Sequence, residues 1–275
     1  MLPANNTNSL NTMSIKTYYK VWKILALNAL QEAFVNRATN VLFMVGKAMR
    51  LVMTVAFLLL IRGNVQTFAG YSTDQLVIFF LMYQILDVSS QVLFRGVYLF
   101  SNLIKSGEFD FYLSKPINPL FRALTGLPDI NDALFLVPNM VLAGYLLSTL
   151  SVHITITSAV LFFILCMNSF LMITALHIFI LAVGILITEV DGMVWLYRDL
   201  TRLGQFPITM YAEPLRLALF FVVPIGFMLT IPAQVLSNLV PTYSVAFTLT
   251  VGILFFLLSL RTWSFAVKRY SSASS

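Results

Sequence analysis

From Ala133 to Thr188 the chain contains no Asp, Glu, Lys or Arg, and none occurs from Leu217 to Leu260 either. A helix needs about 20 apolar residues to cross the roughly 30 Å of hydrocarbon in a bilayer. Each stretch therefore has room for two crossings with a turn between them. Hydrophobic residues make up 59% of the 275 positions and charged residues only 10%, whereas soluble domains are about one-quarter charged. The sequence predicts an all-α, polytopic membrane protein.

Six transmembrane helices are expected within a single membrane domain of residues 15–262. The stretch 155–187 is long for one span and could instead be two segments broken near Asn168. Charge placement favours one helix, because cytoplasmic loops collect Lys and Arg and six spans leave only Arg62 outside. A seventh span would also place Arg198, Arg202 and Arg216 on the outer face. The expected spans are residues 43–61, 76–95, 131–150, 155–187, 215–236 and 244–261, with a polar tail at 1–14, a C-terminal tail at 263–275 and both termini in the cytoplasm.

Residues 15–37 are expected to form an amphipathic helix before the first span. Aromatic and aliphatic side chains recur there at helical spacing, with Lys16, Lys20 and Lys23 between them. This pattern suits a helix that lies in the inner headgroup layer, where its lysines reach anionic lipid. A plain membrane anchor is the alternative. Topology and anionic lipid then account for the net charge of +6, and no nucleic-acid partner is expected.

Catalytic and nucleotide-binding motifs do not occur in the sequence. Val41 and Ala48 stand where the phosphate-binding motif G-x-x-x-x-G-K-[ST] needs Gly and Ser or Thr around Gly46-Lys47. Neither histidine belongs to H-E-x-x-H, and G-x-S-x-G is absent from the sequence. The single cysteine, Cys166, provides neither a disulfide framework nor a metal site. We therefore expect no enzymatic activity, metal or cofactor in this chain itself.

Four polar residues within the expected spans are candidates for a pathway. Asp87 lies near the middle of the second span, Gln84 and Gln91 fall on the same helical face, and Arg50 lies at a comparable depth in the first span. A charge at mid-membrane costs at least about 2.5–3.5 kcal/mol and usually faces a partner or a cavity. Two interpretations stay open: the four side chains line a translocation pathway, or Asp87 and Arg50 form a buried pair that serves helix packing.

Residues 102–121 form a charged, proline-closed segment between two apolar blocks. A Ser-Gly pair is expected to end one helix there, and a proline to end a short second helix. Phe109, Tyr112 and Leu113 fall at i, i+3 and i+4, so the short helix would present an apolar face to a groove in a partner while its acidic residues stay in water. A capped surface loop is the alternative.

The span order and two cytoplasmic segments resemble the permease subunits of type-2 ABC transporters, in particular the compact six-span bacterial subgroup. SGEFDFYLSKPINPLF at 106–121 follows the pattern G-x-x-D-x-x-L-x-K-P-x-x-P-L, and WLYRDLTRLGQFPITMY at 195–211 is the second similar segment. The resemblance implies that the first segment is a coupling helix for a separate ATP-binding cassette ATPase, which would bind ATP and Mg. The residues so implicated are Gly107, Glu108, Phe109, Asp110, Tyr112, Leu113, Lys115 and Pro116, with a second contact through Arg198, Asp199, Arg202, Phe206 and Pro207.

On this resemblance we expect an exporter permease of the bacterial inner membrane. One chain would supply half of the pathway, so a second permease, identical or related, is an expected partner beside the ATPase and membrane lipid. The alternative function is a secondary carrier or channel that uses Asp87 and Arg50. Inverted repeats, which are common among secondary carriers, are not evident in the sequence.

Overall fold

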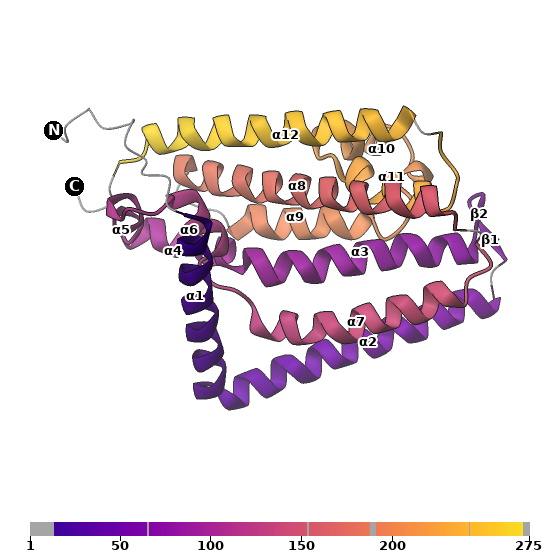
Figure 1. Cartoon of the computed structure of the whole chain (residues 1–275), viewed down its shortest axis with the longest axis horizontal. Coiled ribbons are helices and arrows are strands. Elements are labelled where there is room, and N and C mark those ends of the chain that lie inside the picture. Colours follow the sequence, from indigo (N-terminus) through magenta and orange to yellow (C-terminus); the bar gives the residue numbers. More distant parts are fainter. Residues whose placement is uncertain (1–13, 65, 153, 188–190, 242, 272–275) are drawn as a thin grey trace.

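The computed structural model describes residues 14–64, 66–152, 154–187, 191–241 and 243–271. They form an elongated bundle of helices with one helix standing across its end (Figure 1), which confirms the all-α prediction. Most of the predicted N-terminal tail (1–14) and residues 272–275 of the predicted C-terminal tail lie outside the described residues. The elements are α1 Ile15–Val35, α2 Arg37–Asn64, β1 Thr67–Phe68, β2 Tyr71–Ser72, α3 Thr73–Phe94, η1 Arg95–Leu99, α4 Phe100–Lys105, α5 Phe109–Ser114, α6 Pro119–Thr125, α7 Ile130–Ser148, α8 Ile156–Ile187, α9 Asp191–Leu203, η2 Ile208–Met210, α10 Leu215–Leu217, the π-helical η3 Ala218–Val222 and η4 Gly226–Thr230, α11 Ile231–Leu236 and α12 Tyr243–Lys268.

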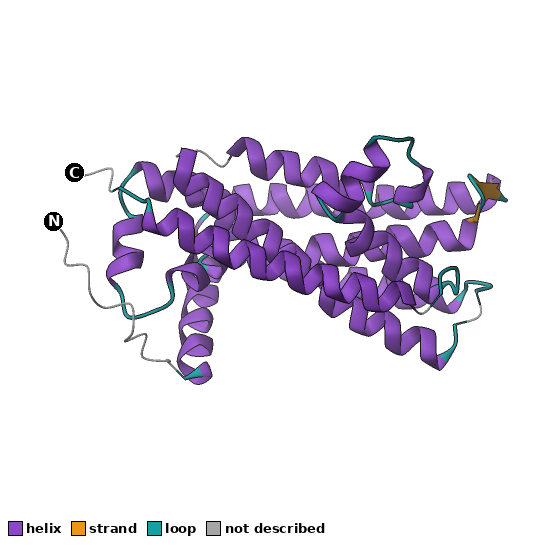
Figure 2. Ribbon diagram, turned by 90° about the horizontal axis from the view of Figure 1, so that it is seen from above, coloured by secondary structure: helices purple, strands orange, loops and turns teal. Residues whose placement is uncertain are grey.

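The two ends of the bundle differ in what they carry. The β end holds the strands β1 and β2, which pair antiparallel with Thr67 opposite Ser72 and Phe68 opposite Tyr71. The α5 end holds α4, α5, α6 and the last turns of α12, and α1 lies across it (Figures 1 and 2). α1 therefore has the transverse orientation that an interfacial helix requires.

Five helical segments among the described residues are long and apolar enough to cross a membrane. They are α2, the run Thr73–Lys105, α7, α8 and α12, and a sixth candidate is a bent pair of stretches, Leu215–Val222 and Gly226–Leu236, at 80° to each other. α8 runs unbroken for 32 residues, so the one-helix interpretation of 155–187 is confirmed. α12 continues to Lys268, beyond the predicted end of the last span.

Polar residues at the helix starts explain where several helices begin. The Ser72 hydroxyl accepts a hydrogen bond from the Gln75 N–H at 3.3 Å, and the Gln75 side chain accepts one from the Ser72 N–H at 2.9 Å. This reciprocal arrangement satisfies two backbone donors that the first turn of α3 would leave unpaired. Asn118 and Asp129 cap α6 and α7 in the simpler way, through one side-chain oxygen each.

The centre of the bundle is formed by α3 and α8. In the most apolar part of each helix, 72% and 61% of the residues are buried, against 11% for α2. Asn168 of α8 donates a hydrogen bond to the Thr248 carbonyl of α12 at 3.0 Å, and Gly252 leaves the space that the Asn168 side chain fills. A polar contact thus joins α8 to α12, whereas α2 lies at the edge of the bundle and packs on α1, α3 and α7 through a small part of its surface.

The bent pair begins and ends at the β end. The Tyr71 hydroxyl, just before α3, forms hydrogen bonds with Thr209 at 2.7 Å and with Gln234 at 2.9 Å. Thr209 precedes the pair and Gln234 lies near its end. Between them, the Met228 carbonyl accepts a hydrogen bond from Ser169, in the middle of α8, at 2.6 Å. The pair therefore enters the bundle from the β end, turns inside it and returns to the same end.

This re-entrant pair corrects the predicted topology. α8 starts at the β end, where the Ser151 N–H donates to Asp74 at 2.8 Å, and α8 ends at the α5 end (Figure 1). The chain returns to the β end through α9 and η2, so residues 191–210 are the fifth segment that runs from one end of the bundle to the other. The predicted span 215–236 is not one straight helix but a pair bent by 80°, both ends of which lie at the β end. Composition does not reveal this, because a straight span and a bent pair have the same apolar content. Arg216 was predicted to be cytoplasmic but lies in α10, which packs on η2 at the β end.

Candidate functional site

α5 is a six-residue helix whose limits are set by a glycine before it and a proline after it. Gly107 has a φ of +75°, a left-handed conformation that costs other L-residues about 1–2 kcal/mol. Lys115 is extended, with a φ of −82° and a ψ of 149°, as expected for the residue before Pro116. The predicted start and stop of this short helix are therefore confirmed.

Phe109 is the buried anchor of α5. Its side chain is 0% exposed, and its ring packs edge-on against Phe100 at 5.2 Å, Trp263 at 6.2 Å and Tyr270 at 5.1 Å. Burial and the negative charge of Asp110 raise the pKa of Tyr270 to about 12, so this phenol stays neutral at physiological pH. The prediction that Phe109 belongs to an exposed docking face is wrong. Its ring is buried within the chain, where it packs α5 against α4 and α12.

The outward face of α5 has a different aromatic residue. Phe111 is 63% exposed and Leu113 is 38% exposed, while Tyr112 is half-buried under the guanidinium of Arg122 at 5.3 Å. Glu108 and Lys115 are exposed and flank the two ends of α5. The sequence analysis missed Phe111, because the alternation Phe-Asp-Phe does not reveal which ring faces inward.

The second predicted contact segment does not lie beside α5 as a unit. Arg198 lies toward the α5 end, where its guanidinium is 5.9 Å from the centre of the Tyr98 ring. Phe206 and Pro207 directly precede η2, whose Thr209 is bonded to Tyr71 at the β end. The helical run that starts just after Tyr71 has 33 residues, a length of roughly 50 Å. Phe206 and Pro207 therefore cannot share a surface with α5, and this part of the prediction is wrong.

Asp87 and Arg50 form the predicted pair between α2 and α3. Arg50 Nη2 donates a hydrogen bond to Asp87 Oδ2 at 2.7 Å, and the same nitrogen lies 3.4 Å from Gln84 Oε1. Gln84 donates in turn to Asn139 of α7 at 3.0 Å. The chain of contacts links three helices, as the packing interpretation requires. Arg50 keeps 44% of its side chain exposed, so the pair also borders open space.

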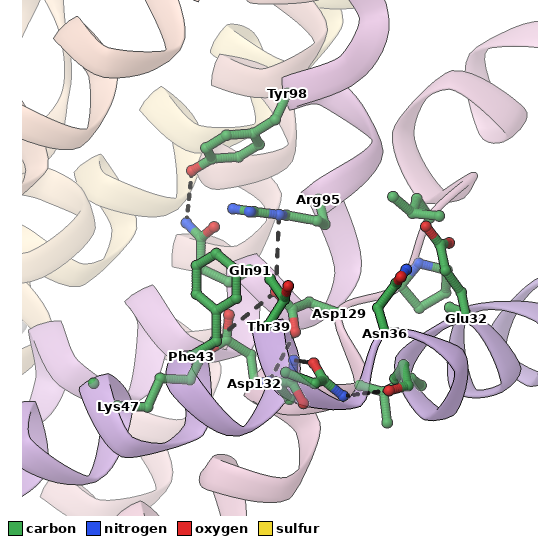
Figure 3. Close-up of a pocket in the computed structure, with 18 of the residues that line it drawn as sticks. Glu32, Asn36, Thr39, Phe43, Lys47, Gln91, Arg95, Tyr98, Asp129 and Asp132 are labelled. Atoms are coloured by element: carbon green, nitrogen blue, oxygen red, sulfur yellow. Dashed lines mark hydrogen bonds and ion pairs between the residues drawn. The ribbon is translucent and has the colours of Figure 1, made fainter.

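That open space is a cavity of about 640 Å³ near the α5 end. Its walls come from α1, α2, the end of α3 with η1, the start of α7, and α9 (Figure 3). Gln91, the fourth predicted pathway residue, lines the cavity and donates to the Tyr98 hydroxyl at 2.8 Å. No local sequence pattern predicts this cavity, because its lining residues come from five segments far apart in the chain.

Comparison with protein families decides the class of the chain. The family model described as "ABC-2 family transporter protein" matches residues 48–274. The chain belongs to the ABC-2 transporter family. Neither the curated proteins nor the solved structures include a match. The matched residues contain the later part of α2, all the following spans, the re-entrant pair and α5, and leave out α1 and the first turns of α2.

ABC-2 membership supports a permease role in ABC transport and implies an ATPase partner. In an ABC-2 protein the described geometry can transmit force in two directions from α5. The helix follows the run Thr73–Lys105 after a short break at residues 106–108, and Phe109 packs it on Trp263 of α12. The described residues offer no cluster of three or more His, Cys, Asp or Glu side chains that could hold a metal ion.

Proposed function

We propose that the chain is the transmembrane subunit of an ATP-binding-cassette exporter and forms half of its translocation pathway. α5 docks on a separate ATPase subunit, which binds ATP and Mg. When two such ATPase subunits close on ATP, each pulls on one α5, and the two permease halves change between inward and outward openings. A second permease, identical or related, completes the pathway. Export follows from the family, in which it is the predominant direction.

The outward aromatic face of α5 is the observation that carries this proposal. Phe109 fixes the helix from the inside, and Phe111 projects from the opposite face with 63% of its surface exposed. Exposed aromatic residues flanked by charges are typical anchors of protein interfaces. In a short helix that leaves the bundle between two spans, such a face suits a groove in a cytosolic partner.

Charge placement supports a cytoplasmic α5 end in a bacterial inner membrane. Cytoplasmic segments collect Lys and Arg, and the β end carries Arg62 and Arg216 in its loops and helix ends. The segments at the α5 end carry more positive residues, namely Lys16, Lys20, Lys23, Lys105, Lys115 and Arg122.

The proposal is tested by co-purification with the ATPase and by its ATP hydrolysis in the assembled complex. The purified chain alone should hydrolyse no ATP. Phe111→Asp should leave membrane insertion intact and weaken the complex by about 2 kcal/mol, roughly 30-fold in affinity. Asn102→Asp adds the same charge on the neighbouring α4 and should leave the complex intact. Equal recovery of the ATPase with both variants would place the docking face elsewhere.

The alternative of a secondary carrier or channel makes a different prediction for reconstituted vesicles. A carrier would move its cargo with the chain alone, driven by an ion gradient. The proposed permease moves no cargo until the ATPase and ATP are added. Transport by the isolated chain, abolished by Asp87→Asn, would overturn the permease proposal in favour of the carrier.

A further inference from the structure

The cavity near the α5 end is lined by both acidic and basic side chains, and one of the basic ones has no acidic partner among the described residues. Asp132 lies 2.5 Å from the Lys47 amine, and Asp129 lies 3.8 Å from both Lys47 and Arg95. These contacts occupy the two carboxylates that are visible in the centre of Figure 3. Among the residues that the structure describes, Arg198 lies on the same cavity and has no acidic partner.

Arg198 is held by aromatic rings. Its guanidinium lies 5.9 Å from the centre of the Tyr98 ring and 5.6 Å from that of Trp195. Arg95 lies 4.8 Å from the centre of the same Tyr98 ring. Contacts to ring faces orient a guanidinium but leave the N–H groups at its edge free to donate. The two rings therefore hold the Arg198 guanidinium in place, with its N–H groups available as hydrogen-bond donors in the cavity.

A buried amide on the same wall has one unused atom. Gln91 is only 4% exposed, and its Nε2 donates to the Tyr98 hydroxyl at 2.8 Å. Its Oε1 is buried without a hydrogen-bond partner, which costs about 1–3 kcal/mol when nothing compensates it. A ligand with a hydroxyl or an amide N–H beside its negative charge would pair with Gln91 and Arg198 together if the Gln91 amide turned its Oε1 toward the cavity, because that atom is closed to solvent here.

The other walls indicate what is attached to that head group. Leu42 and Phe43 of α2 line the cavity, and both are strongly exposed apolar side chains. α1 closes the cavity on the side where Glu32 lies, opposite Tyr98 in Figure 3. An amphiphile could place its head group between Tyr98 and Arg198 and its apolar tail along α2.

We infer that this cavity binds a small anionic amphiphile whose head group is a phosphate or carboxylate with a neighbouring hydroxyl. The volume of about 640 Å³ falls within the range of small-molecule sites. A bilayer lipid and a free amphiphile could both supply this chemistry. The inference goes beyond the ATPase proposal, because binding needs only the isolated chain.

The test measures binding of dodecanoyl lysophosphatidic acid to the full chain in phosphatidylcholine nanodiscs, through the fluorescence of Trp195. We expect saturable binding whose signal is lost in Trp195→Phe. Arg198→Gln should weaken binding about tenfold or more, because a hydrogen bond to a charged group is lost. Arg269→Gln is the matched control, since that guanidinium also stacks on a ring, Phe265 at 4.1 Å, but lies outside the cavity.

Further arms separate the possible outcomes. Monododecanoylglycerol, which has the hydroxyls without the charge, should bind at least about tenfold more weakly. If phosphatidylglycerol in the nanodisc competes with the probe and depends on Arg198, the bilayer supplies the ligand, and if it does not compete, a free amphiphile does. Unchanged binding by Arg198→Gln, or equal binding of the neutral probe, would overturn the inference. Loss of folding in both Arg198→Gln and Arg198→Lys would do the same, because Arg198 would then be a structural residue.

Discussion

Truncation of Phe109 should release α5 from the bundle. The ring is fully buried and contacts three other aromatic residues of α4, α12 and the segment after α12. A buried Phe→Ala change typically costs about 3–5 kcal/mol, and edge-to-face ring pairs contribute about 0.5–1.5 kcal/mol beyond burial. A helix of six residues has no stability of its own. A loss of about 3 kcal/mol should therefore raise the detached population of α5 more than about 100-fold.

Amide hydrogen exchange over residues 107–115 is the direct assay. Phe109→Ala should accelerate exchange there by the same factor, while exchange in the middle of α8 stays slow. Phe111→Ala is the control two residues away. Its side chain is 63% exposed, and surface substitutions usually change stability by less than about 0.5 kcal/mol. In the complex with the ATPase the two variants should both lose stimulated hydrolysis, Phe109→Ala by detaching the helix and Phe111→Ala by removing its contact.

Equal protection of α5 in Phe109→Ala and in the unmodified chain would refute this reasoning. It would mean that Gly107 and Pro116, and not the buried ring, hold α5 in place.

Two further predictions concern α2 and the topology. The Arg50–Asp87 pair is tested by a double-mutant cycle of Arg50→Gln and Asp87→Asn, measured by thermal unfolding in detergent. The double variant should lose less stability than the two single variants lose together, with a coupling energy of about 1 kcal/mol or more. Additive losses of stability would show that the pair does not hold α2. In a chain without its native cysteine, Thr209→Cys should react with an impermeant maleimide from the side opposite to Lys115→Cys, and labelling of both from one side would exclude 191–210 as a crossing.

Hydropathy predicted most of the fold, because crossing the bilayer needs length and the absence of charge, and both can be read along the chain. It failed at 215–236, since a re-entrant pair satisfies the same two conditions. It also missed the crossing at α9, because Arg198, Asp199 and Arg202 make that segment look like a cytoplasmic loop. Only the contacts of Tyr71 with both flanks of the pair distinguish the two arrangements.

The candidate site was predictable in position but not in orientation. The glycine and proline signals fixed the limits of α5 from local conformational preferences alone. Which of two phenylalanines faces inward depends on Trp263 and Tyr270, about 150 residues away in sequence, and no local pattern contains that information. The cavity around Tyr98 could not be predicted from the sequence for the same reason, since residues of five separate segments line it.

The crossing at α9 gives a physical reason for a second permease chain. Asp199 and Arg202 form an ion pair at 3.0 Å, yet 66% and 52% of their side chains are exposed. Charged side chains within a membrane rarely face lipid, because their transfer into hydrocarbon is costly and they face a cavity or a partner instead. In the isolated chain this face of α9 would be such an exception. A neighbouring permease half that encloses a water-filled pathway along α9 removes the conflict, so the exposed pair favours a two-chain permease over a single chain working alone.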